Sequence, residues 1–245
     1  MVSWLTPASG DGSAPFWANR KTNDGSLFNF YKDSAAVGSI GSKDGDLFIH
    51  TGTTGLRFVD GGNSIRPVTS NGNIRDNAID LGGTTSRFKN LYLSGGAYLG
   101  GTAAANKLDD YEEGTWSPVF SASNGSFTTL TMDVVTAKYT KVGRAVHIAC
   151  YIRTDDVDVG TATGGLKIAG LPFASDAFYS LAIGISNSWS GDDPQTAFTN
   201  GSLITLQYKS SISADSGNVN VFDMTTGTTA NQNSICLTGT YFTTA

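Results

Sequence analysis

Two spacings of apolar residues divide this chain into dissimilar halves. Between residues 25 and 101, apolar residues occur in short groups of two to five that end at Gly, Asn, Asp or Ser. From residue 115 onward, longer segments alternate apolar and polar positions, as at Val146, Ile148, Cys150 and Ile152. Alternation with a period of two is typical of a strand with one buried face. The pattern predicts an all-β protein whose two halves are built differently.

The first half is predicted to contain short strands at residues 27–31, 37–42, 46–50 and 55–59. Strands of this length do not form a free-standing sheet with a core of its own. Association would solve this, because three identical chains wound about one axis each supply a few apolar side chains per layer. A single-chain β-solenoid is the alternative, which the irregular repeat disfavours. We therefore expect residues 25–105 to form the Gly-rich, intertwined β shaft of an elongated homotrimer.

A short helix is expected after this shaft. Residues 103–113 combine alanine with acidic residues and precede Gly114, a residue type that commonly ends a helix. Two or three turns are marginal alone, so neighbouring chains would have to support them. We assign residues 106–114 as a short linker or helical collar. Its acidic residues are interpreted as a solvated face or turn rather than catalytic carboxylates: Asp109, Asp110, Glu112 and Glu113.

The second half, residues 115–245, is predicted to form an antiparallel β-sandwich or jelly-roll-like head domain. Turn signals such as Asn124-Gly125, Val142-Gly143 and Asn200-Gly201 separate its strands, and no helical period appears. The expected strands are residues 117–121, 127–132, 134–142, 145–153, 165–168, 179–186, 203–208, 219–222 and 235–242. Trp116 is interpreted as a packing residue at the entry to this domain.

Composition excludes several partners. Charged residues make up 15% of the chain and the net charge is −5, without a basic stripe, so we expect no nucleic-acid partner. No apolar run reaches the roughly 18 residues that a membrane span needs. The first residues lack the basic and apolar regions of a secretory signal, which predicts assembly in a cytoplasm.

The few metal-type ligands do not suggest a metal centre or a cofactor. The two cysteines, Cys150 and Cys236, lie in strand patterns and are interpreted as reduced core thiols, with a disulfide as the minority alternative. His50 and His147 show no ligand spacing relative to them. His147 is expected in mid-strand, on the face opposite Cys150 and beside Tyr151.

Two segments in the middle of the chain resemble bacteriophage tail-fibre proteins. They are DLGGTTSRFKNLYLSGG at residues 80–96 and NKLDDYEEGTWSP at residues 106–118, where a GTW(T/S)P-type motif opens a C-terminal β domain in such fibres. Residues 37–42 and 54–58 are similar to shaft segments, and residues 139–146 and 170–173 to elements of a tip domain. The resemblance, over residues 25–175, implies a homotrimeric virion fibre that touches the host surface and has no catalytic residues.

The sequence therefore predicts a phage virion fibre that adheres to host cells by multivalent recognition of a surface glycan or protein. Two alternatives stay open: a purely structural appendage of the capsid or tail, and a polysaccharide depolymerase. The depolymerase is disfavoured because paired carboxylates in a groove are not evident. Asp155, Asp156 and Asp158 are expected at one hairpin tip and Asp192 and Asp193 in another loop. We expect no enzymatic activity.

Two regions are candidate binding sites. Residues 1–24 would attach the fibre to a tail or capsid protein through Trp4, Phe16 and Trp17, aromatic residues in an otherwise small and polar segment. The host ligand is assigned to Trp189 with Asn187, Asp192 and Asp193, because an aromatic ring among polar groups suits a sugar. Tyr179, beside Asp176, is a second choice. The alternative for Trp189 is inward packing or burial at a trimer interface.

Overall fold

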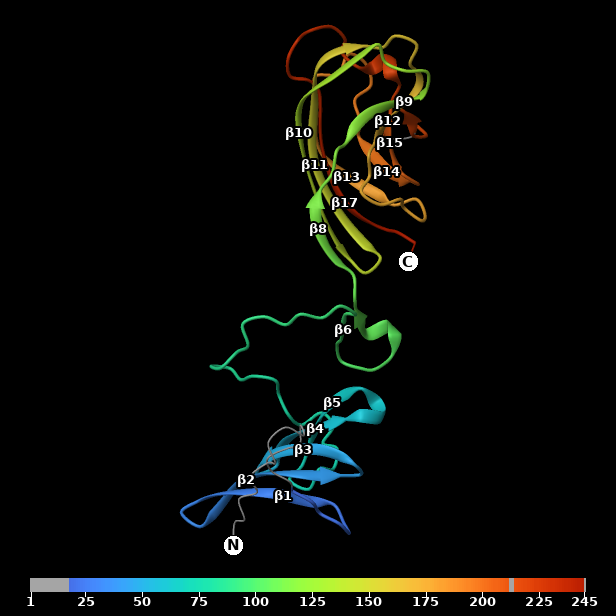
Figure 1. Ribbon diagram of the computed structural model, residues 1–245. Coiled ribbons are helices and arrows are strands. Elements are labelled where there is room, and N and C mark those ends of the chain that lie inside the picture. Colours follow the sequence, from blue (N-terminus) through green and yellow to red (C-terminus); the bar gives the residue numbers. More distant parts are fainter. Residues whose placement is uncertain (1–17, 212–213, 245) are drawn as a thin grey trace, which may run out of the picture. The chain divides into compact units, whose positions relative to one another are not determined.

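The computed structural model describes residues 18–211 and 214–244 (Figure 1). Within these ranges the protein is built from antiparallel strands, and its helical residues are confined to three single-turn 3-10 helices: η1 (Asp60–Gly62), η2 (Ala104–Asn106) and η3 (Val221–Asp223). The predicted all-β class is confirmed. No helix in these ranges is long and apolar enough to cross a membrane. The chain divides into two compact units, Met1–Leu91 and Tyr92–Ala245, called here the N-terminal and C-terminal units.

The N-terminal unit contains one five-stranded antiparallel sheet in which consecutive strands are neighbours. Its strands are β1 (Gly25–Lys32), β2 (Ala35–Lys43), β3 (Asp46–Thr51), β4 (Thr54–Val59) and β5 (Ser64–Val68). The turns explain this order. Asp33 and Ser34 both have positive φ, as do Asp44 and Gly45, and two such residues form the tight turn that matches the twist of a hairpin.

The four strands expected in this half are therefore confirmed, while the expected association of three chains stays a prediction. Strands β1 to β5 pair with one another inside one chain. The physical reason is local: two-residue turns bring consecutive strands together at little entropic cost. Pairing within the chain does not give this sheet two covered faces, because several large apolar side chains of β3 and β4 stay exposed.

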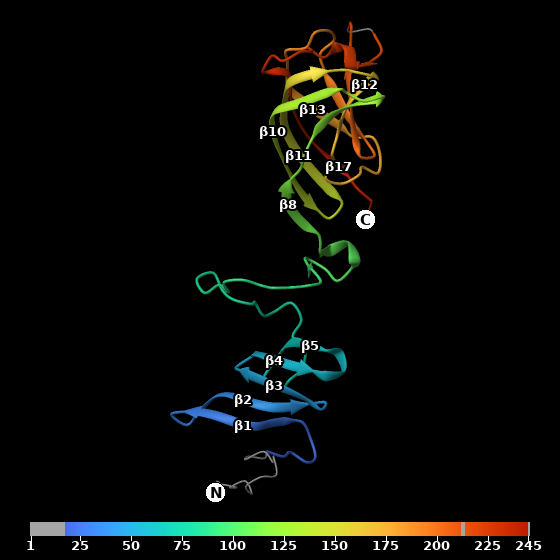
Figure 2. The same cartoon turned by 45° about the horizontal axis from the view of Figure 1, so that its top comes forward.

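The C-terminal unit contains a ten-stranded antiparallel sheet that curls into a half-barrel. The strand order is β8-β10-β11-β17-β13-β14-β15-β12-β9, with β16 paired to β15. Figures 1 and 2 show the long strands β10, β11 and β17 side by side on one wall, with β12, β14 and β15 on the other. The strands are β8 (Tyr111–Thr115), β9 (Val119–Asn124), β10 (Thr129–Val142), β11 (Ala145–Asp158), β12 (Thr163–Ala169), β13 (Ser180–Asn187), β14 (Thr196–Asn200), β15 (Leu203–Tyr208), β16 (Gly217–Asn218) and β17 (Gln232–Phe242).

This arrangement modifies the sandwich prediction. Strand β13 pairs with β17 along most of its length and with β14 at Ser180 and Leu181, so it joins the two walls into one hydrogen-bonded sheet. The core lies inside the curl. Trp116 is part of it, as expected, and its indole nitrogen donates to the Lys138 carbonyl oxygen at 3.3 Å.

The alternation in β11 sorts its side chains as predicted. Val146, Ile148 and Ile152 are fully buried, and Cys150 faces the same core. Burial raises the pKa of the Cys150 thiol to about 12. The other cysteine corrects the expectation of two core thiols: Cys150 lies opposite Leu237 and Cys236 lies opposite Tyr151, so the two thiols are on opposite faces of adjacent strands. Both are free.

The predicted helix over residues 103–113 is wrong. Only η2 is helical there, and it is followed by β7 (Lys107–Leu108), which pairs with β6 (Ala97–Tyr98), and then by β8. Residues of β8 pair with the end of β10, for example Glu113 with Thr140. Helix propensity in so short a segment is a weak preference, and a ready edge strand overrides it.

Smaller corrections follow from the same sheet. The two strands expected at residues 127–132 and 134–142 form the single bulged strand β10. The strand expected at residues 219–222 is mostly the 3-10 helix η3, which is capped by the Asn220 side chain. Strands β8, β14 and β16 of this sheet were not predicted, nor were β5, β6 and β7. Asp155, Asp156 and Asp158 lie within β11 rather than at a hairpin tip.

Candidate functional site

The loop that follows β13 carries the predicted ligand-binding residues. Trp189 is half-buried, and its ring packs edge-on against Phe120 with centroids 5.8 Å apart. Its indole nitrogen is buried without a hydrogen-bond partner in the described residues. Asn187 and Asp193 are exposed, and Asp192 accepts a hydrogen bond from Tyr208, which raises the pKa of that phenol. The ring thus packs inward, while polar groups of the loop face solvent; ligand binding here stays a prediction.

A buried amide holds this loop in place. Asn233, fully buried on β17, donates from its side chain to Thr154 Oγ1 at 2.8 Å and to the Thr225 carbonyl oxygen at 2.9 Å. Its side-chain oxygen accepts from the Thr225 backbone nitrogen at 2.8 Å, and its own backbone nitrogen donates to the Ser188 carbonyl oxygen at 3.1 Å. Sequence analysis did not single out Asn233, because the sequence does not show which distant residues face it.

The second-choice residue, Tyr179, lies elsewhere. It precedes β13 while Trp189 follows it, so the eight-residue strand separates them by roughly 25 Å. The Tyr179 hydroxyl donates to Asp176 at 2.7 Å, and Arg144 forms an ion pair with the same carboxylate. These contacts lower the pKa of Asp176, with the Tyr179 hydrogen bond as the largest cause. The structure joins Tyr179 to Asp176 and not to Trp189, and ligand binding at Tyr179 stays a prediction.

We expect the Tyr179–Asp176 contact to weaken in acid, where the carboxylate of Asp176 is protonated. A lowered carboxylate pKa means that the contact is fully present above the ordinary value of 3.8 and is lost as the pH falls through the lower folded value. Tyr179→Phe removes the largest cause and should raise the pKa of Asp176, measured by carboxyl-carbon NMR titration. Tyr208→Phe, which removes a similar hydrogen bond to Asp192, is the control and should leave Asp176 unchanged. Equal Asp176 titration curves in wild type and Tyr179→Phe would contradict the assignment.

The acidic residues between positions 109 and 113 each contact a different partner. Asp109 forms an ion pair with Lys107 at 2.9 Å, and Asp110 forms one with the buried Lys141. Glu112 and Glu113 accept hydrogen bonds from different tyrosines, Tyr139 and Tyr111. Each carboxylate therefore has its own partner in the described residues. The proposed attachment residues, Trp4, Phe16 and Trp17, lie outside the described residues.

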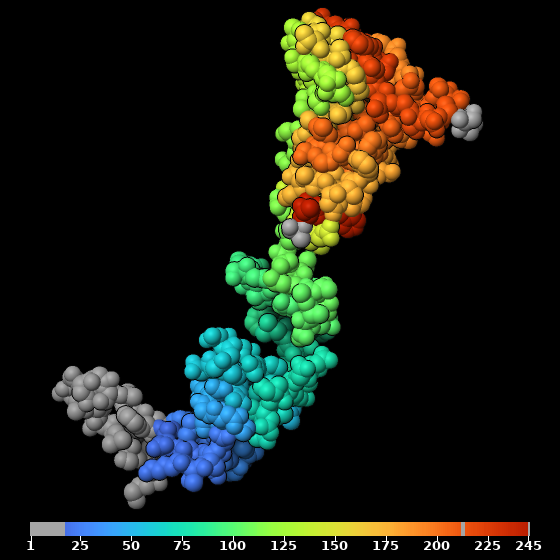
Figure 3. All heavy atoms as spheres, turned by 90° about the vertical axis from the view of Figure 1, so that its right-hand side faces the viewer, coloured from blue at the N-terminus to red at the C-terminus, as the bar shows by residue number. Residues whose placement is uncertain are grey.

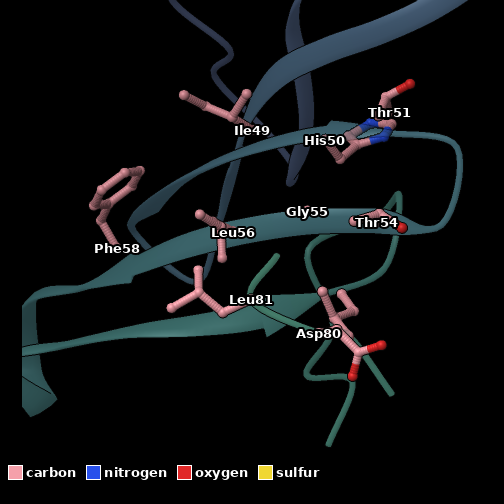
Figure 4. Close-up of a pocket in the computed structure, with 10 residues that line it drawn as sticks. Ile49, His50, Thr51, Thr54, Gly55, Leu56, Phe58, Asp80 and Leu81 are labelled. Carbon is pink, nitrogen blue, oxygen red and sulfur yellow. The ribbon is translucent and has the colours of Figure 1, made fainter. Parts of the chain in front are cut away.

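The N-terminal sheet carries an apolar groove that sequence analysis did not predict. The groove encloses about 460 Å³ between β3, β4 and the segment at residues 79–81. Figure 4 shows the side chains of Ile49, Leu56, Phe58 and Leu81 around it. The alternating apolar residues of β3 and β4 indicate that each strand has an apolar side. Alternation does not indicate which side the rest of the chain covers.

Comparisons with known proteins give a partial structural likeness and no match in sequence. The sequence matches no protein-family model and no curated protein. Among solved structures, the crystal structure of the Dettilon tailspike protein aligns with 54% of this chain at 19% sequence identity and a TM-score of 0.40. The alignment spans 24% of that protein, so it covers only a part of it.

Proposed function

We propose that this chain is a homotrimeric phage virion fibre, on a tail or capsid, that adheres to the host surface through its C-terminal unit. The observation that carries the proposal is the ordered series of tail-fibre-like segments over residues 25–175, in which the GTWSP motif leads into the curled sheet. The antiparallel all-β architecture is in keeping with this reading. In the proposal, residues 1–24 attach the fibre to the particle and residues 25–105 form its shaft.

Recognition would belong to loops held on a rigid sheet. The loop after β13 fits this role because its polar side chains face solvent while Trp189 and Asn233 fix its base. Figure 3 shows one face of the C-terminal unit that is formed largely by segments after β12, coloured orange. Weak binding at each loop is sufficient, because several copies acting together raise the avidity by orders of magnitude. We propose a surface glycan or protein as the ligand and no catalytic step.

The test is competition for adsorption. Purified full-length protein, added to host cells before the phage that carries it, is expected to reduce adsorption, and the Asp192→Asn/Asp193→Asn variant should compete less well. Asp215→Asn, which neutralises an acidic residue outside this loop, is the matched control. Competition without release of reducing sugar ends supports adhesion. Release of reducing ends would instead identify a depolymerase, and undiminished adsorption would favour a purely structural appendage.

A further inference from the structure

One face of the N-terminal sheet is apolar across all five strands. The cross-strand register aligns Phe28, Ile40, Ile49, Leu56 and Pro67 in one unbroken row. The next row on the same side contains Leu47, Phe58 and Ile65. These eight residues are called here the apolar face, and none of them carries a charge.

The opposite face carries the polar side chains, and it is the covered one. Arg57 is buried there and pairs with Asp46 at 2.8 Å, while the His50 ring lies 2.6 Å from the Ser39 hydroxyl. The turn after β5 closes over Phe48 so tightly that a Cβ added to Gly72 would lie 2.9 Å from its ring. The sheet therefore covers the side that carries Arg57, Asp46 and Phe48. On its apolar side only residues 79–81 border the groove, and most of that face stays exposed, which water does not favour for a lone chain.

This reversal leaves the unit without an adequate core. Among its described residues, Phe48 and Val68 are the hydrophobic side chains that are fully buried. Five residues of the apolar face are between 42% and 62% exposed: Leu47, Ile49, Leu56, Phe58 and Ile65. Exposed contiguous apolar surface on a sheet marks an interaction site. Phe48 and Val68 alone do not bury enough apolar surface to stabilise the sheet, so the sheet needs a partner that is always present.

A second copy of the same chain meets this requirement. Every copy is made together with its partners, and the N-terminal unit carries both halves of an apolar contact. One half is the apolar face with its groove of about 460 Å³. The other is a pair of side chains outside the sheet and outside the groove that are at least 65% exposed: Phe88 and Leu91. The eight residues of the apolar face carry no charge and offer no attachment for a partner recognised by charge, while Asp80 and His50 also line the groove.

We infer that the apolar face is buried by further copies of this chain, and that the N-terminal unit completes its core only on assembly. The inference rests on the homotrimeric part of the proposed function and deepens it by naming the surface. It also implies that the C-terminal unit folds before assembly and the N-terminal unit completes its fold during assembly. The C-terminal unit has a core of its own and does not need other copies to bury it.

The first test locates the contact in the native protein. A photoreactive benzoylphenylalanine replaces Phe58, and ¹⁴N- and ¹⁵N-labelled copies are assembled together before illumination. Mass spectrometry then separates mixed-isotope crosslinks between copies from crosslinks within one copy. We expect mixed-isotope crosslinks from position 58 to the N-terminal unit of another copy. Crosslinks within single copies alone, in a protein that is assembled, would overturn the surface assignment and leave the fibre proposal standing.

The second test weakens the contact. Leu56→Asp places a charge at the centre of the apolar face and should weaken assembly at least 100-fold by sedimentation equilibrium. Asn29→Asp adds a charge to the opposite face of the same sheet and should assemble like wild type. Resistance of the buried Cys150 to alkylation verifies that the C-terminal unit of Leu56→Asp is folded. Wild-type-like assembly of Leu56→Asp contradicts the inference, and a monomeric wild type contradicts both it and the homotrimer.

Discussion

Replacing Asn233 with alanine is expected to lower the free energy of unfolding of the C-terminal unit by about 3–4 kcal/mol. The substitution removes the three hydrogen bonds of the buried side chain and leaves the Thr225 backbone nitrogen without its acceptor. A buried polar group that loses its partner costs about 1–3 kcal/mol by itself. Unfolding can be followed by pulsed alkylation of Cys150 across a urea series, because this thiol is protected in the folded unit.

Asn233→Ala also places alanine in a left-handed backbone conformation, and Asn231→Ala separates this backbone cost from the loss of the hydrogen bonds. Asn231 and Asn233 both have positive φ, at 68° and 47°, but Asn231 is exposed. Alanine at position 231 should therefore cost only the left-handed backbone preference, about 1 kcal/mol. Similar losses in the two variants would show that the buried network contributes nothing measurable. A larger loss at Asn233 should be accompanied by greater solvent exposure of Trp189, seen as quenching of its fluorescence, since the network fixes the Ser188 end of its loop.

Gly125→Ala is expected to destabilise the same unit by about 3 kcal/mol or more. Gly125 has a φ of +70°, and an added Cβ would lie 2.0 Å from the Thr161 carbonyl oxygen. Thr161 has little freedom to move away, because its backbone nitrogen donates to the Ser126 carbonyl oxygen at 3.1 Å. The two chain segments that contain these residues are coloured green and yellow in Figure 3, where green and yellow segments lie side by side in the C-terminal unit. The measurement is again alkylation of Cys150 in urea.

Gly143→Ala is the matched control for this clash. Gly143 also has a positive φ, +57°, but no atom lies within 4 Å of its added Cβ. This variant should lose about 1 kcal/mol, the cost of the left-handed conformation alone. If Gly125→Ala lost no more than Gly143→Ala, the close approach to Thr161 would be absent in solution.

Strand positions were predictable where alternation was long. In β11, four alternating apolar residues indicated both the strand and its buried face, because every second side chain of a pleated strand points to the same face of the sheet. Prediction failed where tertiary pairing overrode local preference. Residues 111–115 look compatible with a helix, yet they add a strand to the edge of β10. The Val219–Phe222 pattern was apolar enough for a strand, but the Asn220 cap turns it into η3.

The candidate sites depended even more on the fold. Trp189 was chosen for its polar neighbours in sequence, but its ring orientation follows from Phe120, which lies on a distant strand. Tyr179 and Asp176 could be considered together from the sequence because they are only three residues apart, and the structure joins them by a hydrogen bond. Asn233 was missed, since its partner Thr154 is 79 residues away.

The amino-acid sequence by itself determined that this chain is all-β, where most strands begin, and which of their residues are apolar, since these follow from local alternation and turn chemistry. Only the tertiary structure decided which faces are covered. Alternation places Leu47 and Ile49 on one side of β3, and Leu56 and Phe58 on one side of β4. A covered face requires a second layer, and the order and curl of the strands determine where that layer exists. In the C-terminal unit the curl provides it, whereas in the N-terminal sheet the chain covers the polar side and leaves the apolar face exposed.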